Sequence, residues 1–171
     1  MKKALSTSIQ YLKGIGPKRA KTLNKLGINN IEDLLYYFPR RYEDRTKFLP
    51  ISKLKEGEFQ TIKAKVLALG ERKSWKRRGF SILEVAVGDD TGKIFCVWFN
   101  QAYLKEYFKA GSTLILYGKI GRFTDRLQMN SPEFELVAQE GDESLNIGRI
   151  VPLYCLPQGL TQRYFRRLLK Y

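Results

Sequence analysis

The sequence predicts a mainly β protein with a small α-helical subdomain at its N-terminus. Before about residue 47, apolar residues recur at helical spacing, whereas from Phe59 onward they alternate with polar residues, as they do in strands. Five alternating segments follow one another, and one helical segment separates the third from the fourth. A chain of 171 residues is long enough for one barrel and a small second domain.

Two short helices and a preceding hairpin are predicted within residues 1–47. Pro17 occupies the favoured first position of a helix, and Gly27 follows its end. Asn30 is placed to cap a second helix over 31–35. Ahead of them, residues 12–20 have the hairpin of a helix-hairpin-helix unit, whose glycines let backbone N–H groups approach a DNA phosphate. The candidate phosphate contacts are Gly14, Gly16, Lys18 and Arg19, and the alternative is a tight turn between packed helices.

The barrel is predicted over residues 48–140. Its strands are expected at 59–68, 82–87, 93–99, 113–120 and 127–134. In the first strand, the row expected to face the core is Ile62, Ala64, Val66 and Ala68. A helix capped by Asn100 and closed near Gly111 follows the third strand, with Leu104 and Phe108 facing inward. This chain order is that of the oligonucleotide-binding (OB) fold, a five-stranded Greek-key barrel with a helix between strands 3 and 4; a generic small β-barrel is the alternative.

The charge balance points to a polyanionic partner. Lys and Arg number 31 against 17 Asp and Glu, which leaves a formal net charge of +14 and favours nucleic acid or anionic lipid. The chain has no histidine, so it lacks the commonest general base and the commonest zinc ligand. The Gly-Lys pairs at Gly92 and Gly118 are each followed by Ile, and no phosphate-binding ATPase loop is present. We therefore expect no catalytic residue, cofactor or metal in this chain.

The remaining polar features are predicted to be structural. Cys96 lies within an apolar run, as a buried reduced thiol does, and Cys155 is far from it. Asp89 and Asp90 precede Thr-Gly and are typical of a turn. The apolar run that a secretion signal needs near the N-terminus is broken by Gln10, Lys13 and Lys18, so a cytoplasmic protein without membrane contact is expected.

Two barrel loops combine cations with an aromatic ring. In the OB fold, the ligand crosses the face around strands two and three, between the loop that joins strands one and two and the loop that joins strands four and five. Cations neutralise phosphates, and an aromatic face can stack on an unpaired base. The candidates are Lys73, Trp75, Lys76, Arg77 and Arg78 in the first loop and Arg122, Phe123 and Arg126 in the second. The strand order places both loops on one side of the barrel, whereas the pattern alone favours packing for Phe99 and Tyr103.

Several stretches resemble the RecG family of ATP-dependent DNA helicases. They are 12–17, 26–28, 33–35 and 38–45, the last of which reads Phe-Pro-Arg-Arg-Tyr-Glu-Asp-Arg. The barrel is similar to the wedge domain of that family, and the tail from 151 to 168 resembles the approach to its helicase domains. Because a helix expected from Tyr164 is still running at Tyr171, we interpret 141–171 as a linker and the start of a truncated helicase domain of a longer protein.

The resemblance implies that the parent protein reverses replication forks and migrates Holliday junctions in DNA repair and recombination, using ATP and Mg²⁺. It implies forked or branched DNA as the partner, with the wedge splitting the strands. The family's stacking Phe and Tyr match Phe99 and Tyr103, which favours base stacking over packing for these two residues. A monomer is expected. The alternatives are a protein-interaction barrel that docks an acidic partner, such as the tail of a single-strand-binding protein, and RNA binding.

Overall fold

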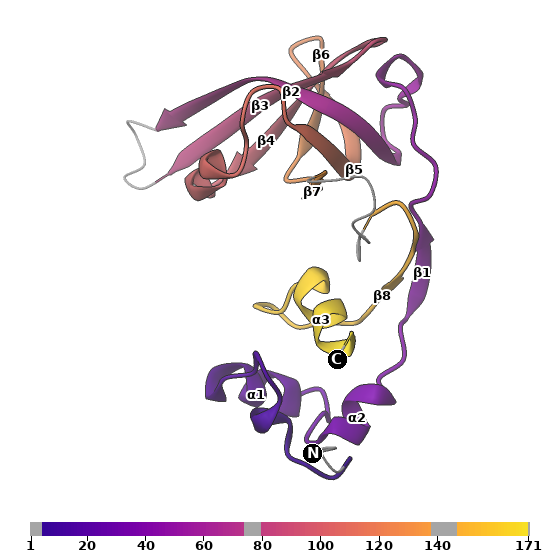
Figure 1. Ribbon diagram of the computed structural model, residues 1–171, viewed down its shortest axis with the longest axis vertical. Coiled ribbons are helices and arrows are strands. Elements are labelled where there is room, and N and C mark those ends of the chain that lie inside the picture. Colours follow the sequence, from indigo (N-terminus) through magenta and orange to yellow (C-terminus); the bar gives the residue numbers. More distant parts are fainter. Residues whose placement is uncertain (1–4, 74–79, 138–146, 171) are drawn as a thin grey trace. The chain divides into compact units, whose positions relative to one another are not determined.

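The computed structural model describes residues 5–73, 80–137 and 147–170 and divides the chain into two compact units (Figure 1). The first unit comprises Met1–Glu43 and Val151–Tyr171, and the second comprises Asp44–Ile150. These units differ from the three predicted segments 1–47, 48–140 and 141–171. The C-terminal segment, expected to be a linker leading into another domain, belongs with the N-terminal helices.

The first unit is a small helical body with a core built from both ends of the chain. Its elements are η1 (Ile9–Tyr11), α1 (Pro17–Asn24), α2 (Ile31–Leu35), β1 (Arg41–Asp44), β8 (Ile150–Leu153) and α3 (Gln162–Leu169). The core comprises Ile9, Ile15, Ala20, Leu23, Ile28, Leu34, Leu160, Tyr164, Phe165 and Leu168. The C-terminal segment therefore completes the core that the N-terminal helices begin.

Local sequence explains the helices of this unit. Pro17 is the first residue of α1, as predicted. The Asn30 side chain accepts a hydrogen bond from the Asp33 N–H at 2.8 Å, and the Asp33 carboxylate accepts one from the Asn30 N–H at 3.2 Å. This capping box starts α2 at the predicted residue. Thr161 caps α3 in a similar way, by accepting a hydrogen bond from the Tyr164 N–H.

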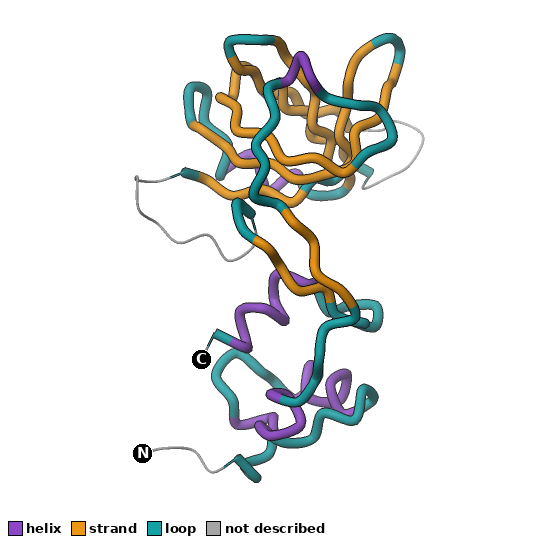
Figure 2. The backbone as a smooth tube through the Cα atoms, turned by 90° about the vertical axis from the view of Figure 1, so that its right-hand side faces the viewer, coloured by secondary structure: helices purple, strands orange, loops and turns teal. Residues whose placement is uncertain are grey.

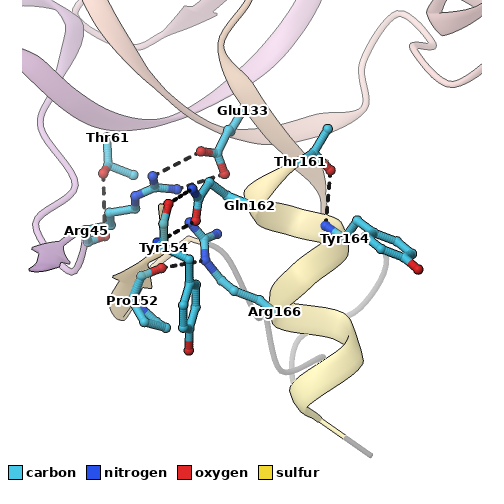
Figure 3. A network of polar contacts seen from close by, with 9 residues as sticks. All are labelled: Arg45, Thr61, Glu133, Pro152, Tyr154, Thr161, Gln162, Tyr164 and Arg166. Carbon is cyan, nitrogen blue, oxygen red and sulfur yellow. Dashed lines mark hydrogen bonds and ion pairs between the residues drawn. The ribbon is translucent and has the colours of Figure 1, made fainter. Parts of the chain in front are cut away.

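The strands β1 and β8 pair with each other, and neither is predicted from the sequence (Figure 2). Each has only four residues, too few to show a clear alternation of apolar and polar side chains. Beyond β8, the Gln162 side chain bonds both the N–H and the C=O of Tyr154, at 3.0 and 2.7 Å (Figure 3). This amide satisfies the backbone groups at the end of the strand as a neighbouring strand would.

The second unit has the predicted OB fold. Its strands are β2 (Phe59–Lys73), β3 (Ser81–Asp89), β4 (Gly92–Phe99), β5 (Thr113–Phe123), β6 (Arg126–Asn130) and β7 (Glu133–Leu136), with η2 (Ile51–Lys53) before them and η3 (Ala102–Glu106) between β4 and β5. The sheet order is β2-β3-β4-β6-β5-β7, and a further pairing of β2 with β5 returns the order to its start. The predicted fifth strand is divided into β6 and β7, since Ser131 between them adopts a φ of 46° and Pro132 follows.

The barrel core consists of the inward rows of these strands. Its buried members are Ile51, Ile62, Ala64, Val66, Leu83, Val85, Val87, Ile94, Cys96, Trp98, Leu104, Phe108, Leu114, Leu116, Ile120 and Met129. The prediction is wrong for Ala68, which is exposed because β2 has a bulge between Val66 and Ala68. Leu69 packs against the core instead. Cys96 is a free, buried thiol, as predicted, and its burial raises the pKa of the thiol.

The turn between β3 and β4 is held by Asp89. Its Oδ1 accepts hydrogen bonds from the N–H and hydroxyl of Thr91 and from the Gly92 N–H, at 2.8, 2.6 and 3.0 Å. Its Oδ2 accepts the Ile51 N–H at 2.8 Å and thereby fixes η2 to the turn. The turn predicted at this acidic residue is confirmed.

No helix in the described part of the chain is long and apolar enough to cross a membrane.

Candidate nucleic-acid interface

The end of β4 presents two exposed aromatic rings. Phe99, the last residue of β4, is 39% exposed, and Tyr103 in η3 is 59% exposed. Phe80 stacks against Phe99, with ring centroids 6.1 Å apart and planes inclined by 24°. In contrast, Leu104 and Phe108 of the same segment are buried in the barrel core, as predicted. Phe99 and Tyr103 lie outside that core and are partly exposed to solvent, with Phe80 stacked against one side of the Phe99 ring.

Asn100 fixes the turn between these two rings. It does not cap the following helix as predicted, because the N-cap residue of η3 is Gln101. Asn100 adopts a φ of 55°, in the left-handed region that Asn tolerates better than most residues. Its N–H donates to the Ser81 C=O at 2.8 Å, and its side-chain oxygen accepts the Ser81 N–H at 3.2 Å. The start of β3 is thereby clamped to the turn that leaves β4.

The predicted basic loop is only partly described. Trp75, Lys76, Arg77 and Arg78 lie outside the described residues. Lys73, the last residue of β2, is exposed and pairs with Ser81, whose neighbour Ile82 pairs with Phe99. The strand ends that flank this loop therefore adjoin the exposed ring of Phe99.

The β5–β6 hairpin carries the second set of predicted contacts. Its turn residues Thr124 and Asp125 both have positive φ, at 47° and 61°, as a tight hairpin turn of the mirror-image type requires. Phe123, before the turn, is exposed. Arg122 lies 3.4 Å from the Glu56 carboxylate, so a neighbouring acid offsets its charge. Arg126, after the turn, has its guanidinium carbon 5.1 Å from the centroid of the Phe95 ring.

The described strand ends that flank the first predicted loop lie beside one end of β4, and the β5–β6 hairpin lies toward the other end. Phe95, Val97 and Phe99 alternate along β4 with the buried Ile94, Cys96 and Trp98, so the first three share the outer side. Because β6 runs parallel to β4 with Gln128 opposite Phe95, Arg126 lies toward the start of β4. Phe99, at the other end of β4, lies near Lys73 at the end of β2.

The opposite outer face carries a buried arginine that is not among the predicted contacts. The Arg45 side chain is 1% exposed and forms two hydrogen bonds with the Glu133 carboxylate, at 2.9 and 3.0 Å (Figure 3). Its guanidinium carbon lies 3.8 Å from the ring centroid of Tyr117 on β5. The Thr61 hydroxyl on β2 donates to the Arg45 C=O. Arg45 thus binds the segment before β2 to this face.

The hairpin at Gly14 is bonded to other residues of the first unit. Gly14 has a φ of 90°, which only glycine adopts readily. Its C=O accepts hydrogen bonds from Arg19 at 3.1 Å and from the Tyr164 hydroxyl at 3.0 Å. The Arg19 guanidinium also lies 4.4 Å from the Tyr164 ring centroid. Burial raises the pKa of Tyr164, so the hydroxyl remains a donor. These contacts give Arg19 a structural role, whereas Gly16 and Lys18 are exposed.

The described residues form no group that fits Mg²⁺, and the sequence offers no loop that fits the phosphates of ATP. The sequence has no phosphate-binding loop. Within residues 5–73, 80–137 and 147–170, no group of three Asp, Glu, His or Cys residues is placed to hold a metal ion.

An OB fold with exposed aromatic rings and with cations near both ends of β4 has the features of a nucleic-acid-binding module. The model of the RecG wedge domain family matches residues 8–171, and the chain therefore belongs to this family.

The relatives agree with this assignment. The chain is 36% identical over 168 residues to the ATP-dependent DNA helicase RecG of Thermotoga maritima, covering 96% of this chain and 20% of that protein. It is 32% identical to RecG of Haemophilus influenzae, covering 92% of this chain and 22% of that protein. A solved structure of RecG bound to a three-way DNA junction matches 99% of this chain and 23% of that one, with a TM-score of 0.82 and 33% identity. The chain spans about a fifth of the length of the curated relatives it matches.

Proposed function

We propose that this chain is the structure-selective DNA-binding wedge of an ATP-dependent helicase that reverses replication forks and migrates Holliday junctions in DNA repair and recombination. The observation that carries the proposal is the exposure of Phe99 and Tyr103, outside the barrel core, on either side of the turn fixed by Asn100. The solved relative bound to a three-way junction supports branched DNA as the ligand.

Stacking explains how such a site selects a branch. Where a duplex opens into two strands, the first unpaired base of each strand loses the neighbour that stacked on it. The ring of Phe99 or Tyr103 replaces that neighbour, and such stacking stabilises binding by about 1–3 kcal/mol per base. Linear duplex has no unpaired base to offer. The cations Lys73 and Arg126 attract phosphates of either DNA and therefore add affinity without selectivity.

The motor belongs to other parts of the parent helicase. The sequence of this chain has no phosphate-binding loop, and the role that we assign to it is to bind the branch and to hold the separated strands apart. We expect the chain to act in the cytoplasm and to bind DNA as a monomer.

The test compares the affinity of this chain for forked, three-way and blunt linear DNA by fluorescence anisotropy. We expect tighter binding to the branched forms. F99A/Y103A should remove most of that preference and leave duplex affinity within about twofold, because duplex contacts are electrostatic. Tyr107→Ala is the matched control, since Tyr107 is a comparably exposed ring that follows η3. Equal affinity of the unaltered chain for fork and duplex would contradict the proposal.

Two competitors separate the alternatives. An acidic peptide with the composition of a single-strand-binding protein tail should displace forked DNA weakly if the barrel is a DNA module. Displacement at low concentration, with F99A/Y103A unaffected in fork binding, would favour the protein-interaction module. A fork of the same design made of RNA tests whether the site distinguishes the two nucleic acids.

A further inference from the structure

Most of the positive charge of the chain lies in its first unit. Residues 1–43 and 151–171 contain 13 Lys and Arg against 3 Asp and Glu, a formal net charge of +10. The barrel unit, 44–150, contains 18 against 14, which leaves +4 in a longer stretch and completes the +14 of the chain. The surplus that indicates a polyanionic partner therefore comes chiefly from the helical unit and not from the barrel.

We propose that the outward face of α3, with Arg163, Arg167 and Lys170, binds the phosphate backbone of a duplex arm of branched DNA. The inference rests on the proposed function, because a branch joins duplex arms to the unpaired bases that the barrel stacks. It adds a second binding site, in the other unit of the chain. This site uses none of the backbone N–H groups of the Gly14 hairpin.

The sequence of α3 separates a core face from a cationic face. Its residues in the core of the first unit are Tyr164, Phe165 and Leu168. Arg163, Arg167 and Lys170 are exposed, and their spacings of four and three place them on one side of the helix. Arg166 is 5% exposed, and its Nε donates to the Pro152 C=O at 3.0 Å (Figure 3). One cation of this segment is thus structural, and three are directed to solvent.

The segments that build this surface contain no acidic residue. Neither Asp nor Glu occurs in 1–31 or in 151–171. Two of the three acids of the unit have structural roles, since Asp33 belongs to the capping box of α2 and Glu43 pairs with Arg41. The field around α3 is therefore strongly positive, which attracts phosphates and repels no part of a DNA backbone.

A cation from the other end of the chain adjoins the cationic face. The guanidinium carbon of Arg19 in α1 lies 4.4 Å from the ring centroid of Tyr164, and that of Arg167 lies 5.9 Å from the same centroid. An aromatic ring positions a guanidinium without neutralising its charge. Tyr164 itself is only 9% exposed, so its ring offers little face for a base. This surface is suited to phosphates, whereas the exposed rings of Phe99 and Tyr103 are suited to bases.

The length of the cationic face suits one strand of a duplex. From Arg163 to Lys170, the helix rises about 10 Å, at about 1.5 Å per residue. A DNA strand carries one phosphate about every 3.4 Å of the duplex axis, so about three phosphates fall within that length when α3 lies along the strand. Phosphate contacts carry no sequence information, and the surface should bind any duplex arm. The helical unit then supplies affinity, and the barrel supplies selectivity.

The test measures the affinity of the whole chain for a blunt linear duplex and for a fork at several salt concentrations. R163Q/R167Q/K170Q should weaken binding to both by about tenfold and by similar factors, since both contain duplex. The slope of log affinity against log salt should become shallower by about 2–3, at about 0.9 for each of three phosphates. The charge-conserving variant R163K/R167K/K170R should bind nearly as the unaltered chain does.

A matched set of barrel residues controls for net charge. Lys63, Lys65 and Lys119 are exposed on the outer side of β2 and β5, and K63Q/K65Q/K119Q removes the same number of charges. This variant should keep its duplex affinity within about twofold at 0.1 M salt, because charges more than about 10 Å from the DNA are screened. Thermal unfolding checks that each variant is folded.

A second measurement uses the unaltered chain. Bound duplex should protect Lys170 from acetylation, as quantified by mass spectrometry, and should leave the three control lysines reactive. Equal reactivity of Lys170 with and without duplex would contradict the proposed contact.

The outcomes separate this site from the proposed function. Equal losses in the two glutamine variants would mean that net charge alone determines affinity, and the α3 site would be wrong. If R163Q/R167Q/K170Q binds duplex as the unaltered chain does but loses binding to phosphatidylglycerol vesicles, the face binds anionic lipid instead. If forks are preferred but the α3 variant keeps its affinity, the helical site is wrong and the barrel site stands. If forks are not preferred, the proposed function fails, whereas the duplex titrations still test α3.

Discussion

The guanidinium carbon of Arg45 lies 3.8 Å from the centroid of the Tyr117 ring, and both guanidinium ends are bonded to Glu133. We expect Arg45→Ala to lower the free energy of unfolding of the barrel by about 2–3 kcal/mol, because the variant removes charged hydrogen bonds and a cation–π interaction together. Urea denaturation measures this change. Arg41→Ala is the control, since the exposed Arg41 forms an ion pair with Glu43, and equal destabilisation of the two variants would contradict the prediction.

Stability of the barrel should depend on the ionisation of Asp89. Burial by itself raises the pKa of Asp89, but hydrogen bonds from Thr91, Ile51 and Gly92 outweigh it, and the net effect lowers the pKa. A carboxyl whose pKa is lowered on folding stabilises the protein above its unfolded pKa, and this stabilisation is lost as pH falls through the folded value.

Unfolding free energies measured between pH 7 and pH 2 should therefore decrease below about pH 4. Asp89→Asn should be less stable at neutral pH and should show a shallower decrease. The exposed neighbour Asp90 serves as the control through Asp90→Asn. Asp44, whose pKa the side chain of Thr46 lowers, contributes in the same direction in every variant, so a residual slope is expected. An unchanged slope in Asp89→Asn would count against the prediction.

Two variants near the Gly14 hairpin test whether this hairpin serves packing or phosphate binding. Arg19→Ala removes a hydrogen bond to the Gly14 C=O and the interaction with the Tyr164 ring, and we expect the first unit to lose about 1–2 kcal/mol of stability. Lys18→Ala changes an exposed residue one position away and should leave stability unaltered. If Lys18→Ala also leaves DNA affinity unaltered at low salt, the hairpin serves packing and the predicted phosphate contact is wrong.

The basic loop should control affinity for all DNA. Reversing the charge of Lys76, Arg77 and Arg78 should weaken binding to fork and duplex by similar factors, because phosphates are common to both. The slope of log affinity against log salt should become shallower by about 0.9 for each phosphate that the loop no longer neutralises. Anisotropy titrations between low and physiological salt measure both quantities. Selective loss of fork binding would instead assign branch recognition to this loop.

Much of the barrel could be predicted because alternation is a local property of the chain. Two strands show this alternation directly. Their inward residues, all buried, are Leu83, Val85 and Val87 in β3 and Ile94, Cys96 and Trp98 in β4. The bulge in β2 could not be predicted, since Ala68 and Leu69 are both acceptable inward residues until the partner strand fixes the register.

The less predictable parts of the site depend on contacts between distant residues. The position of Arg126 beside Phe95 follows from the parallel pairing of β4 with β6, which chain order does not reveal. Arg45 reads in the sequence as one more cation, and its burial depends on Glu133, 88 positions away. Phe99 and Tyr103 show no pattern that separates stacking from packing, and the family resemblance singled them out.

The core of the first unit also determines when that unit can form. Tyr164 bonds to Gly14 across 150 positions of sequence, whereas the barrel is one continuous stretch, Asp44–Ile150. Domains commonly fold from the N-terminus onward as the ribosome makes them. Here the order should be reversed, because the barrel is complete in the nascent chain before α3 has been synthesised. The apolar faces of the N-terminal helices would then stay exposed until α3 has been synthesised and can pack against them.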